Sequence, residues 1–482
     1  GLIHILKSYK FTIAENTPIE EDIALDPELL GRVFENLLAS YNPETKVTAR
    51  KMTGSFYTPR EIVDYMVDES LISYLKHKLT LNGFENREAH IRELISYSVA
   101  SNPFSNIETN LLIDAVDNCK IIDPACGSGA FPMGILHKLT HILHKLDPQN
   151  ELWKQKQIKK AQIIDDISIR DQLIEDIEIA FKENELDYGR KLYLIENCIY
   201  GVDIQPIATQ ISRLRFFISL IVDQKVVKAK ENFGVRPLPN LETKFVAANT
   251  LFSLEKPKGQ LNLFDDKAVY ELEERLKSVR HRLFSAKTPA TKRKLREEDQ
   301  VLREKMTEIL VVNGWGDEAA KQLAAWDPYD QNRFSPFFES EWMFGLESGF
   351  DICIGNPPYV FARSGESKGL TEVEKAHFYK NYSLAEYQIN LYPLFIERGT
   401  KLLNDHGTLS FITPNNWLTI NTNSLLRKFV LERAECVLVN FFARVFESAA
   451  VDSCIVVYRK TGSNNILKLF EYSDSLELVR EV

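Results

Sequence analysis

The chain has 482 residues, of which 44% are hydrophobic and 26% are charged, a composition typical of an ordinary globular protein and not of a disordered or fibrous one. The formal net charge of -9 does not by itself indicate a nucleic-acid partner, because a DNA-binding face usually carries an excess of Lys and Arg; a separate recognition domain can hold that basic surface. No apolar run approaches the ~20 residues of a membrane span and no signal peptide is evident, so we expect a cytoplasmic protein without membrane contact.

The six cysteines and nine histidines do not indicate a metal site. No two cysteines form a Cys-x-x-Cys pair, and most lie in apolar runs, so we predict buried free thiols. His137 and His141 share one helix face at metal-ligand spacing, but Lys138 stands where a zinc protease carries its Glu, and no third ligand is evident. We therefore predict that the chain holds no metal.

The first 50 residues are predicted to form a helical connector. Asp26 is suited to cap a helix, and apolar residues follow one face over 27–38. Two later stretches, at about 135–196 and 255–340, are rich in charge and in helical spacing, which predicts two helical insertions. The basic run 292–296 in the second insertion can contact a phosphate backbone, although a solvated helix is the more common reason for such a run.

Short β-branched runs alternate with the helical stretches, which is the pattern of a doubly wound α/β sheet. Each of the first four runs leads into a polar or glycine-containing turn. Because ligands bind outside the carboxyl ends of the strands in such sheets, these four turns are where we expect chemistry. The predicted strands are 118–123, 198–203, 243–248, 350–355, 408–413, 436–441 and 453–459.

The first turn follows Asp123 and contains Gly127-Ser128-Gly129 ahead of a predicted helix. The glycines permit positive φ and let a ligand lie against bare backbone, while the helix N-terminus favours an anionic group such as a carboxylate. Pro132 occupies the place of the third glycine of the dinucleotide fingerprint, which argues against NAD.

The second and third turns offer one polar side chain each. Asp203 ends the predicted strand 198–203, where an acidic residue can accept hydrogen bonds from both hydroxyls of a ribose. Alone it is more simply an exposed strand-end Asp, but beside the glycine turn the ribose interpretation is favoured. Asn249 can bond the exocyclic amine of a cofactor adenine, and an ordinary turn or cap role is an equally good interpretation.

The fourth turn is Asn356-Pro357-Pro358-Tyr359, directly after the strand 350–355. Two prolines at the end of a buried strand remove two backbone donors, which a purely structural turn does not require. An oxygen of Asn356 and the carbonyl of Pro357 can both accept from an aryl NH2 and favour a pyramidal nitrogen that attacks a sulfonium methyl. Tyr359 supplies a face on which an extruded base stacks.

With this tetrapeptide the sequence resembles the N6-adenine DNA methyltransferases, and within them the methylase region of type IIG restriction–modification enzymes. The resemblance extends from about residue 25 to about 460. It implies a Rossmann-like methyltransferase fold, in which a seven-stranded mixed sheet carries helical insertions. It also implies S-adenosyl-L-methionine as cofactor, double-stranded DNA as partner and methyl transfer to a flipped adenine.

The resemblance assigns cofactor roles to residues in four motifs. The run 54–59 resembles the family's motif upstream of the glycine turn, and Asn249 and Thr250 stand where the family often has an Asp that binds the adenine amine. The positions that match the cofactor motifs are Tyr57, Thr58 (at the methionine end), Asp123, Ala125, Gly127, Asp203, Ile204, Asn249 and Thr250.

The catalytic tetrapeptide matches Asn356, Pro357, Pro358 and Tyr359. The runs 390–397 and 407–414 resemble the next helix and strand of the family. Arg444-Val445-Phe446 resembles the motif whose aromatic packs on the flipped adenine, so Phe446 is the candidate for the second face of the base sandwich; core packing beside Val445 is its alternative.

The family's order of motifs implies three regions: the connector at 1–50, a methyltransferase catalytic domain at 51–462, and the start of a truncated target-recognition region at 463–482. No Pro-Asp…Glu-x-Lys nuclease signature stands in residues 1–50. We therefore expect nuclease and target-recognition domains on the full-length chain but not here, and a fragment that does not cleave DNA.

Three alternatives remain open. N4-cytosine methylation more often goes with Ser in place of Asn356. Methyltransferases of protein glutamine amides share the tetrapeptide, but they are shorter and lack the helical insertion before it. An inactive DNA-binding scaffold is the non-enzyme alternative, against which the intact Asp123, Asp203 and Asn356 argue.

Overall fold

A computed structural model describes most of the chain from residue 58 onward. The described residues are 41–42, 47–48, 58–99, 101–162, 170–171, 174, 186–224, 238–254, 267–286, 288–313, 315–359, 370–386, 389–441, 445, 452–462, 466–472 and 476–481. The helix predicted over 27–38 lies outside them. Within them, no helix combines the length and apolar character needed to span a bilayer.

One mixed sheet runs through the molecule, in the order β11-β10-β8-β9-β7-β6-β3-β4-β5. The strands β5, β4, β3, β6 and β7 are parallel neighbours, whereas β9 lies antiparallel between β7 and β8. Their bounds are β3 (Ile121–Asp123), β4 (Ile199–Asp203), β5 (Phe245–Ala247), β6 (Phe350–Gly355), β7 (Leu403–Pro414), β8 (Ala434–Phe441), β9 (Ser453–Arg459), β10 (Leu467–Tyr472) and β11 (Leu476–Glu481). A separate antiparallel pair joins β1 (Tyr41–Asn42) to β2 (Val47–Thr48).

All seven predicted strands are present, and the predicted α/β methyltransferase fold is confirmed. The predicted number of strands, seven, is wrong, because the sheet has nine strands within the described residues. The hairpin of β10 and β11 adds to it, with β10 pairing in parallel with β8. Without β10, this side of β8 would be an open edge whose backbone groups lack partners. This pairing was not predicted, because residues 463–482 were expected to begin a target-recognition region; that assignment stays a prediction.

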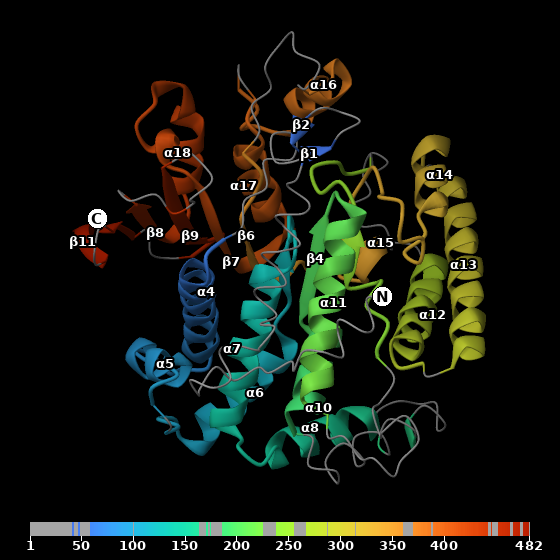
Figure 1. The fold of residues 1–482 in the computed structure, drawn as a ribbon, viewed down its shortest axis with the longest axis horizontal. Helices are drawn as coiled ribbons and strands as arrows, with labels where there is room; N and C mark the ends of the chain where they lie inside the picture. Colours follow the sequence, from blue (N-terminus) through green and yellow to red (C-terminus); the bar gives the residue numbers. More distant parts are fainter. Residues whose placement is uncertain are drawn as a thin grey trace.

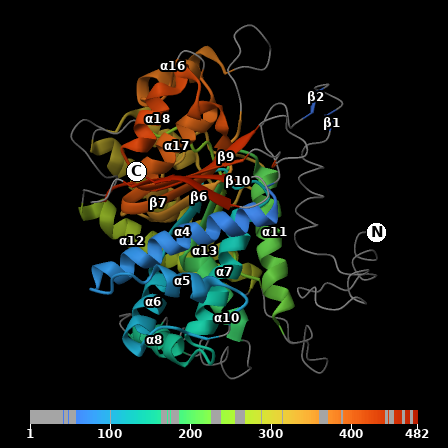
Figure 2. The same cartoon turned by 90° about the vertical axis from the view of Figure 1, so that its left-hand side faces the viewer.

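Helices cover both faces of the sheet. Figure 2 shows α4 and α7 on one side and α17 and α18 on the other. The helices are α4 (Arg60–Leu81), α5 (Glu88–Ile95), α6 (Asn106–Asn118), α7 (Ala130–Leu146), α8 (Glu151–Gln162), α10 (Leu186–Asn197), α11 (Pro206–Val222), α12 (Lys267–Phe284), α13 (Pro289–Val312), α14 (Asp317–Ala325), α15 (Ser340–Phe344), α16 (Glu372–Asn381), α17 (Leu391–Leu402) and α18 (Ser424–Leu431), with 3₁₀ turns η2 (Asn415–Leu418) and η3 (Asn421–Asn423). Both predicted insertions contain helices where they are described, α8 and α10 in the first and α12 to α14 in the second, whereas residues 326–339 of the second are not helical.

The alternation of side chains along the strands divides the core in two. Ile121 of β3 belongs to the cluster under α4 and α7, whereas its neighbour Ile122 belongs to the cluster that includes α12 and α17. In β9, Ile455 and Val456 divide in the same way. Because successive strand residues point to opposite faces, the central strands β3, β4 and β9 are buried on both sides and appear in the sequence as nearly continuous apolar runs, whereas β10 is half-buried along its length. In the second insertion, α12 and α14 both lie along α13, beyond the β4 side of the sheet (Figure 1).

Helix α4 crosses the sheet. It begins two residues after Thr58, and near its other end it contacts Arg459, the last residue of β9. At that end, Nδ1 of His77 accepts a hydrogen bond from Nη2 of Arg459 at 2.9 Å, and the ring stacks obliquely on His406. A guanidinium offers only donors, so the contact requires a neutral His77. Burial, with the Arg459 charge adding to it, lowers the pKa of His77 to about 4.

This contact predicts a pH dependence of stability. The pKa of His77 is lower in the fold than its ordinary value of 6.5, so the stabilisation is complete above about pH 6.5 and is lost as the pH falls through 4. We expect the melting temperature of the wild type to fall more steeply over this range than that of His77→Asn, which keeps an acceptor for Arg459 but does not titrate. Thermal unfolding followed by circular dichroism at several pH values measures this, and parallel curves for the two proteins would refute it.

Candidate active site

The four motif-bearing turns lie together at one edge of the sheet, at the carboxyl ends of β6, β3, β4 and β5. Asp123 at the end of β3 is paired with Gly201 of β4, and Asp203 at the end of β4 is paired with Ala247 of β5. On the other side, β6 ends at Gly355, directly before Asn356. Neighbouring strands lie about 4.8 Å apart, so side chains from all four turns face one shared region.

The turn after β3 depends on two glycines for its backbone conformation and is hydrogen-bonded to Asp203 at the end of β4. Gly127 and Gly129 have φ angles of 52° and 82°, in the region that favours glycine, and helix α7 begins at the next residue, Ala130. The amide N–H of Gly127 donates to Oδ2 of Asp203 at 2.9 Å. A Cβ on Gly129 would lie 2.9 Å from Oγ of Ser212, so a side chain does not fit there without displacement. The backbone N–H groups in the first turn of α7 therefore lie next to the glycine turn, at the site.

Asp203 holds two turns at once. Its Oδ2 accepts from Gly127 and its Oδ1 accepts from the N–H of Gln205 at 2.8 Å. Burial raises the pKa of the Asp203 carboxyl, while these two backbone N–H groups lower it. Each carboxylate oxygen has a second lone pair, so these bonds leave capacity for ligand hydroxyls. Ile204, the next residue, is 47% exposed and gives the site an apolar surface.

Asp123 lies deeper, and 2% of it is exposed. Its Oδ1 accepts from the N–H of Ala125 at 3.1 Å. Its Oδ2 is buried and makes no hydrogen bond within the described residues, which marks an acceptor that a bound group can satisfy. Burial raises the pKa of the Asp123 carboxyl well above its usual range, against the N–H of Ala125, and the charge of Asp203 raises it further.

The glycine turn and the turn 356–359 come close together at Gly355. A Cβ at this position would lie 2.6 Å from Oδ1 of Asp123, a distance that real Cβ atoms do not show. Gly355→Ala is therefore expected to lower stability by about 1–3 kcal/mol and to weaken any ligand held by the glycine turn, because the Asp123 carboxylate must move. Thermal unfolding and ligand titration measure the two effects.

Gly316 provides the matched control for that substitution. It precedes α14 at φ -60°, and no atom lies within 4 Å of the position of an added Cβ. Gly316 is the N-cap of α14, where Ala is less favourable than Gly, so Gly316→Ala is expected to lower stability slightly and to leave the ligand affinity unchanged. Equal effects of the two substitutions would show that the contact between Gly355 and Asp123 is not tight.

Asn356 is oriented by a residue from the other end of the domain. Its Nδ2 donates to Oγ1 of Thr58 at 3.1 Å, and Thr58 is 3% exposed. Because the amide nitrogen of Asn356 is bonded to Thr58, the amide oxygen points the other way and is the group that can accept a hydrogen bond. Pro357 and Pro358 restrict the backbone that carries this group. The family resemblance implies that Thr58 lies at the methionine end of a cofactor, which stays a prediction; its bond to Asn356 was not predicted.

The ring of Tyr359 is fixed at two points. Its hydroxyl donates to the carbonyl of Ile412 in β7 at 3.0 Å, and Tyr392 of α17 packs edge-on against it, with ring centroids 6.4 Å apart and an interplanar angle of 85°. Tyr392 in turn donates to Oδ1 of Asn416 at 3.2 Å. Burial raises the pKa of Tyr359 well above its usual range, so the phenol remains a neutral donor. Tyr392 lies in the run 390–397 quoted for the resemblance, but it was not predicted as a site residue.

Asn249 and Thr250 follow β5. Oδ1 of Asn249 accepts from the N–H of Leu251 at 3.3 Å, which is the turn role that the sequence left as an alternative. Thr250 is 3% exposed, and its Oγ1 donates to the carbonyl of Pro124 at 2.7 Å, which connects this turn to the glycine turn. Contacts of either side chain with a cofactor adenine stay predictions.

Two predicted site residues, Tyr57 and Phe446, lie outside the described residues. The described part of the chain has no group of three or more His, Cys, Asp or Glu side chains placed to hold a metal. His141 uses its Nε2 in a 3.1 Å contact with the carbonyl of Ser96.

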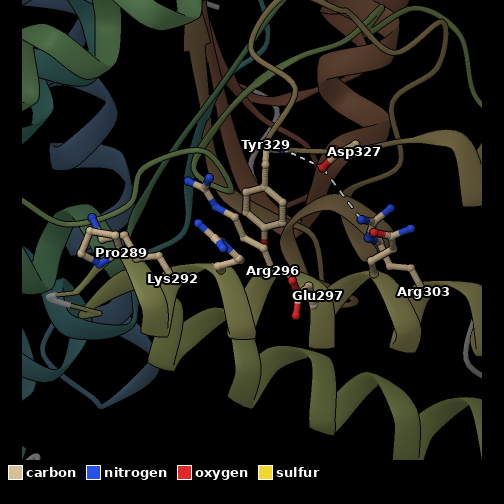
Figure 3. A pocket seen from close by; sticks show the side chains of 9 residues that line it. Pro289, Lys292, Arg296, Glu297, Arg303, Asp327 and Tyr329 are labelled. Atoms are coloured by element: carbon tan, nitrogen blue, oxygen red, sulfur yellow. Dashed lines mark hydrogen bonds and ion pairs between the residues drawn. The ribbon is translucent and has the colours of Figure 1, made fainter.

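The basic run of the second insertion lies apart from the four turns. Lys292 and Arg296 line a cavity of about 470 Å³ on α13 together with Tyr329, and none of the residues lining it belongs to the four strand ends (Figure 3). Arg296 lies over the ring of Tyr329 and bonds Oε1 of Glu242 at 3.1 Å. Its charge is therefore already paired with a carboxylate that lies ahead of β5, outside the insertion, and contact of this run with phosphate stays a prediction.

Several known proteins are similar to the chain in sequence. The putative type II restriction enzyme and methyltransferase RM.MjaORFECS2P of Methanocaldococcus jannaschii is 26% identical over 95% of this chain and 40% of its own length. The type II restriction enzyme and methyltransferase RM.Eco57I of Escherichia coli is 23% identical over 74% of this chain and 26% of its own length. The type II methyltransferase M.TthHB8I of Thermus thermophilus is 37% identical over 23% of this chain. The chain thus spans less than half the length of these relatives.

The chain is also similar to a solved structure, that of the type IIL restriction–modification enzyme MmeI in complex with DNA. The match covers 94% of this chain and 43% of that chain, with 14% identity and a TM-score of 0.44. The family model of the Eco57I restriction-modification methylase matches residues 197–446. This match takes in more than half of the chain, from the strand that ends at Asp203 through the tetrapeptide at Asn356. The chain belongs to the Eco57I restriction-modification methylase family.

Proposed function

We propose that the chain is the methyltransferase part of a restriction–modification enzyme and that it transfers a methyl group from S-adenosyl-L-methionine to the exocyclic N6 of an adenine in double-stranded DNA. The observation that carries the proposal is the catalytic turn: the Asn356 amide is oriented by Thr58, and the turn directly adjoins Asp123. Family membership and the fold support methyl transfer as the reaction.

The residues at the four strand ends fit the proposed cofactor. The N–H groups at the start of α7 suit the methionine carboxylate, because helix N-termini favour anions. Asp203 would take the ribose hydroxyls on its remaining lone pairs, and the exposed side chain of Ile204 would lie against the adenine. The unsatisfied Oδ2 of Asp123 is an acceptor for a ligand or a water held with it.

The cofactor supplies an electrophilic methyl group on a sulfonium, and the chain supplies the geometry of attack. The target amine is a poor nucleophile because its lone pair is delocalised into the ring. Oδ1 of Asn356 and the carbonyl oxygen of Pro357 would accept hydrogen bonds from its two N–H groups, which favours a pyramidal nitrogen and stabilises the positive charge that develops on it. The proton then lost is strongly acidic, so no strong base is required.

The base has to leave the duplex to reach this turn. The ring of Tyr359, held by Ile412 and Tyr392, would stack on one face of the extruded base, and stacking on a fixed aromatic offsets part of the cost of unpairing. Phe446 is proposed for the other face.

Two alternative substrates use the same chemistry. N4 of cytosine is also an aryl amine, and the Asn at 356 favours adenine because cytosine enzymes more often carry Ser there. A protein glutamine amide is disfavoured by the helical insertion of α12 to α14 and by the family match. An inactive scaffold is disfavoured because Asp123, Asp203 and Asn356 are all present and lie at the same edge of the sheet.

Further domains are proposed on the natural polypeptide. The relatives named as both restriction enzyme and methyltransferase extend well beyond the matched region, which supports a nuclease and a target-recognition domain on the same chain. Recognition of a specific DNA site would then belong to the second of these, and residues 463–482 would lead toward it.

Two measurements test the proposal. Isothermal titration with S-adenosyl-L-methionine is expected to show one site per chain. Incubation with the tritiated methyl donor and unmethylated mixed-sequence DNA, followed by digestion to nucleosides and mass spectrometry, is expected to yield N6-methyladenine. N4-methylcytosine as the product would overturn the adenine assignment, and binding of the methyl donor without any transfer to DNA would favour the scaffold.

A further inference from the structure

We propose that Arg398 is a positioning residue for the adenine end of the cofactor site, because its guanidinium fastens the turn after β5 to the second helical insertion. The inference rests on the proposed function, since it assumes that this turn borders the cofactor adenine. We call residues 249–254 the adenine-side turn and residues 335–339, where the insertion rejoins the sheet, the return segment.

The adenine-side turn is bonded along its length to the return segment. Ser335 forms a parallel bridge with Ala248, so the return segment continues the sheet beyond the end of β5. The end of the insertion therefore packs directly against the adenine-side turn and is hydrogen-bonded to it. The bonds are Ser335 N–H to Ala247 O (2.8 Å), Asn249 N–H to Ser335 O (2.9 Å), Phe338 N–H to Phe252 O (2.8 Å) and Leu254 N–H to Glu339 Oε1 (2.9 Å).

Arg398 closes this arrangement from helix α17. Its Nε donates to the carbonyl of Thr250 at 2.9 Å and its Nη2 donates to the carbonyl of Phe338 at 2.7 Å. One side chain therefore bonds both segments at once. Within the described residues Arg398 forms no ion pair, so its charge acts on these two carbonyl dipoles. A guanidinium suits this position because its N–H groups lie in a rigid planar fork, whereas a lysine is a point charge on a flexible stem.

The position of Arg398 separates its effect from the catalytic turn. Tyr392, which packs on Tyr359, lies six residues earlier in α17, about 9 Å along the helix. Thr250 also bonds Pro124 of the glycine turn, so a loosened adenine-side turn alters the cofactor pocket. Asn356 is held by Thr58 from another element and is not reached by this path. Loss of the Arg398 bonds should therefore change cofactor affinity and leave the chemical step almost unchanged.

Two substitutions and two ligands test the role. Arg398→Met removes both bonds and keeps much of the apolar stem, while Arg398→Lys keeps the charge and can bond one carbonyl at a time. The ligands are S-adenosyl-L-methionine and 5′-methylthioadenosine, which has the adenine and the ribose but lacks the amino acid. We expect Arg398→Met to weaken both ligands by about tenfold and by similar factors, with an intermediate loss for Arg398→Lys and a kcat at saturating cofactor within about twofold of wild type.

Arg427 offers a matched control. Its Nη1 donates to the carbonyls of Trp417 and Ile420 at 2.7 Å and 2.6 Å, so Arg427→Met also removes an arginine that bonds two backbone carbonyls, but away from the adenine-side turn. It is expected to leave the affinity for methylthioadenosine unchanged. Thermal unfolding of every variant records how much stability each pair of bonds contributes.

Three results would overturn the role of Arg398. The first is an unchanged affinity for both ligands in Arg398→Met, and the second is a loss of affinity for S-adenosyl-L-methionine but not for methylthioadenosine, which would place the effect at the methionine end. The third is an equal loss of affinity in Arg398→Met and Arg427→Met, which would indicate general loosening. Failure of the wild type to bind either ligand would instead overturn the proposed function, and the inference with it.

Discussion

Asn356→Ala is expected to reduce methyl transfer to DNA by at least about a hundredfold while the affinity for S-adenosyl-L-methionine stays within about twofold of wild type. The substitution removes the amide oxygen that would accept from the target amine, and removal of one preorganised polar group at a reacting centre typically costs this much in kcat. Asn356 lies after β6 and is bonded to Thr58, not to the turns after β4 and β5 that would hold the adenosine. Single-turnover transfer of tritiated methyl and calorimetric titration measure the two quantities.

Thr58→Val is the informative companion to this substitution. It keeps the oxygen of Asn356 but removes the hydroxyl that orients the amide, so we expect a smaller loss of transfer than in Asn356→Ala. Simultaneous loss of transfer and of cofactor binding in Asn356→Ala would show that the residue belongs to the cofactor site and that its catalytic role is misassigned.

Asp203→Ala should have the largest effect on cofactor affinity, a loss of about 1–3 kcal/mol or roughly ten- to a hundredfold. The carboxylate would lose its bonds to the ribose, and it already holds the N–H groups of Gly127 and Gln205, so its removal also releases the glycine turn. The transfer rate at saturating cofactor is expected to fall much less. Titration with S-adenosyl-L-methionine measures the affinity, and an unchanged value would exclude Asp203 from the site.

Asp147 is the control for the structural part of this effect. It ends α7 at the opposite end from the glycine turn, and its two oxygens accept from the N–H groups of Glu151 and Trp153 at 3.1 Å and 2.8 Å. Asp147→Ala therefore removes a carboxylate with the same backbone bonds about 25 Å away along the helix. We expect it to lower the melting temperature and to leave the cofactor affinity unchanged.

Features with a local physical cause could be predicted from the sequence. The strands read as short buried runs, the glycine turn follows from the steric demand for positive φ at Gly127 and Gly129, and the shared edge of Asp123, Asp203 and Asn356 follows from parallel strand ends. These residues meet because parallel strands end at the same edge; the alternation of strands and helices implied that edge, whereas the order of the strands was not predicted.

Pairings between distant parts of the chain could not be predicted in this way. Thr58 and Asn356 are 298 residues apart, and Arg398 and Thr250 are 148 apart, so no periodicity relates either pair. The hairpin of β10 and β11 was missed for the same reason, because its assignment depends on the open edge of β8 and not on its own short runs. Such contacts depend on how distant segments pack in three dimensions, and the spacing of residues in the sequence does not specify that packing.

Helix α4 connects the side-chain amide of Asn356, through Thr58, to the opposite end of the sheet. Thr58, which orients Asn356, lies two residues before the first residue of α4, and His77 in the same helix is bonded to Arg459 of β9. The 22 residues of α4 form a rod about 33 Å long. Lys76, beside His77, pairs with Glu435 at the start of β8, the strand to which the last hairpin is added. A displacement of β8 where the hairpin joins the sheet would therefore be transmitted along helix α4 to the side-chain amide of Asn356, and not only through the strands.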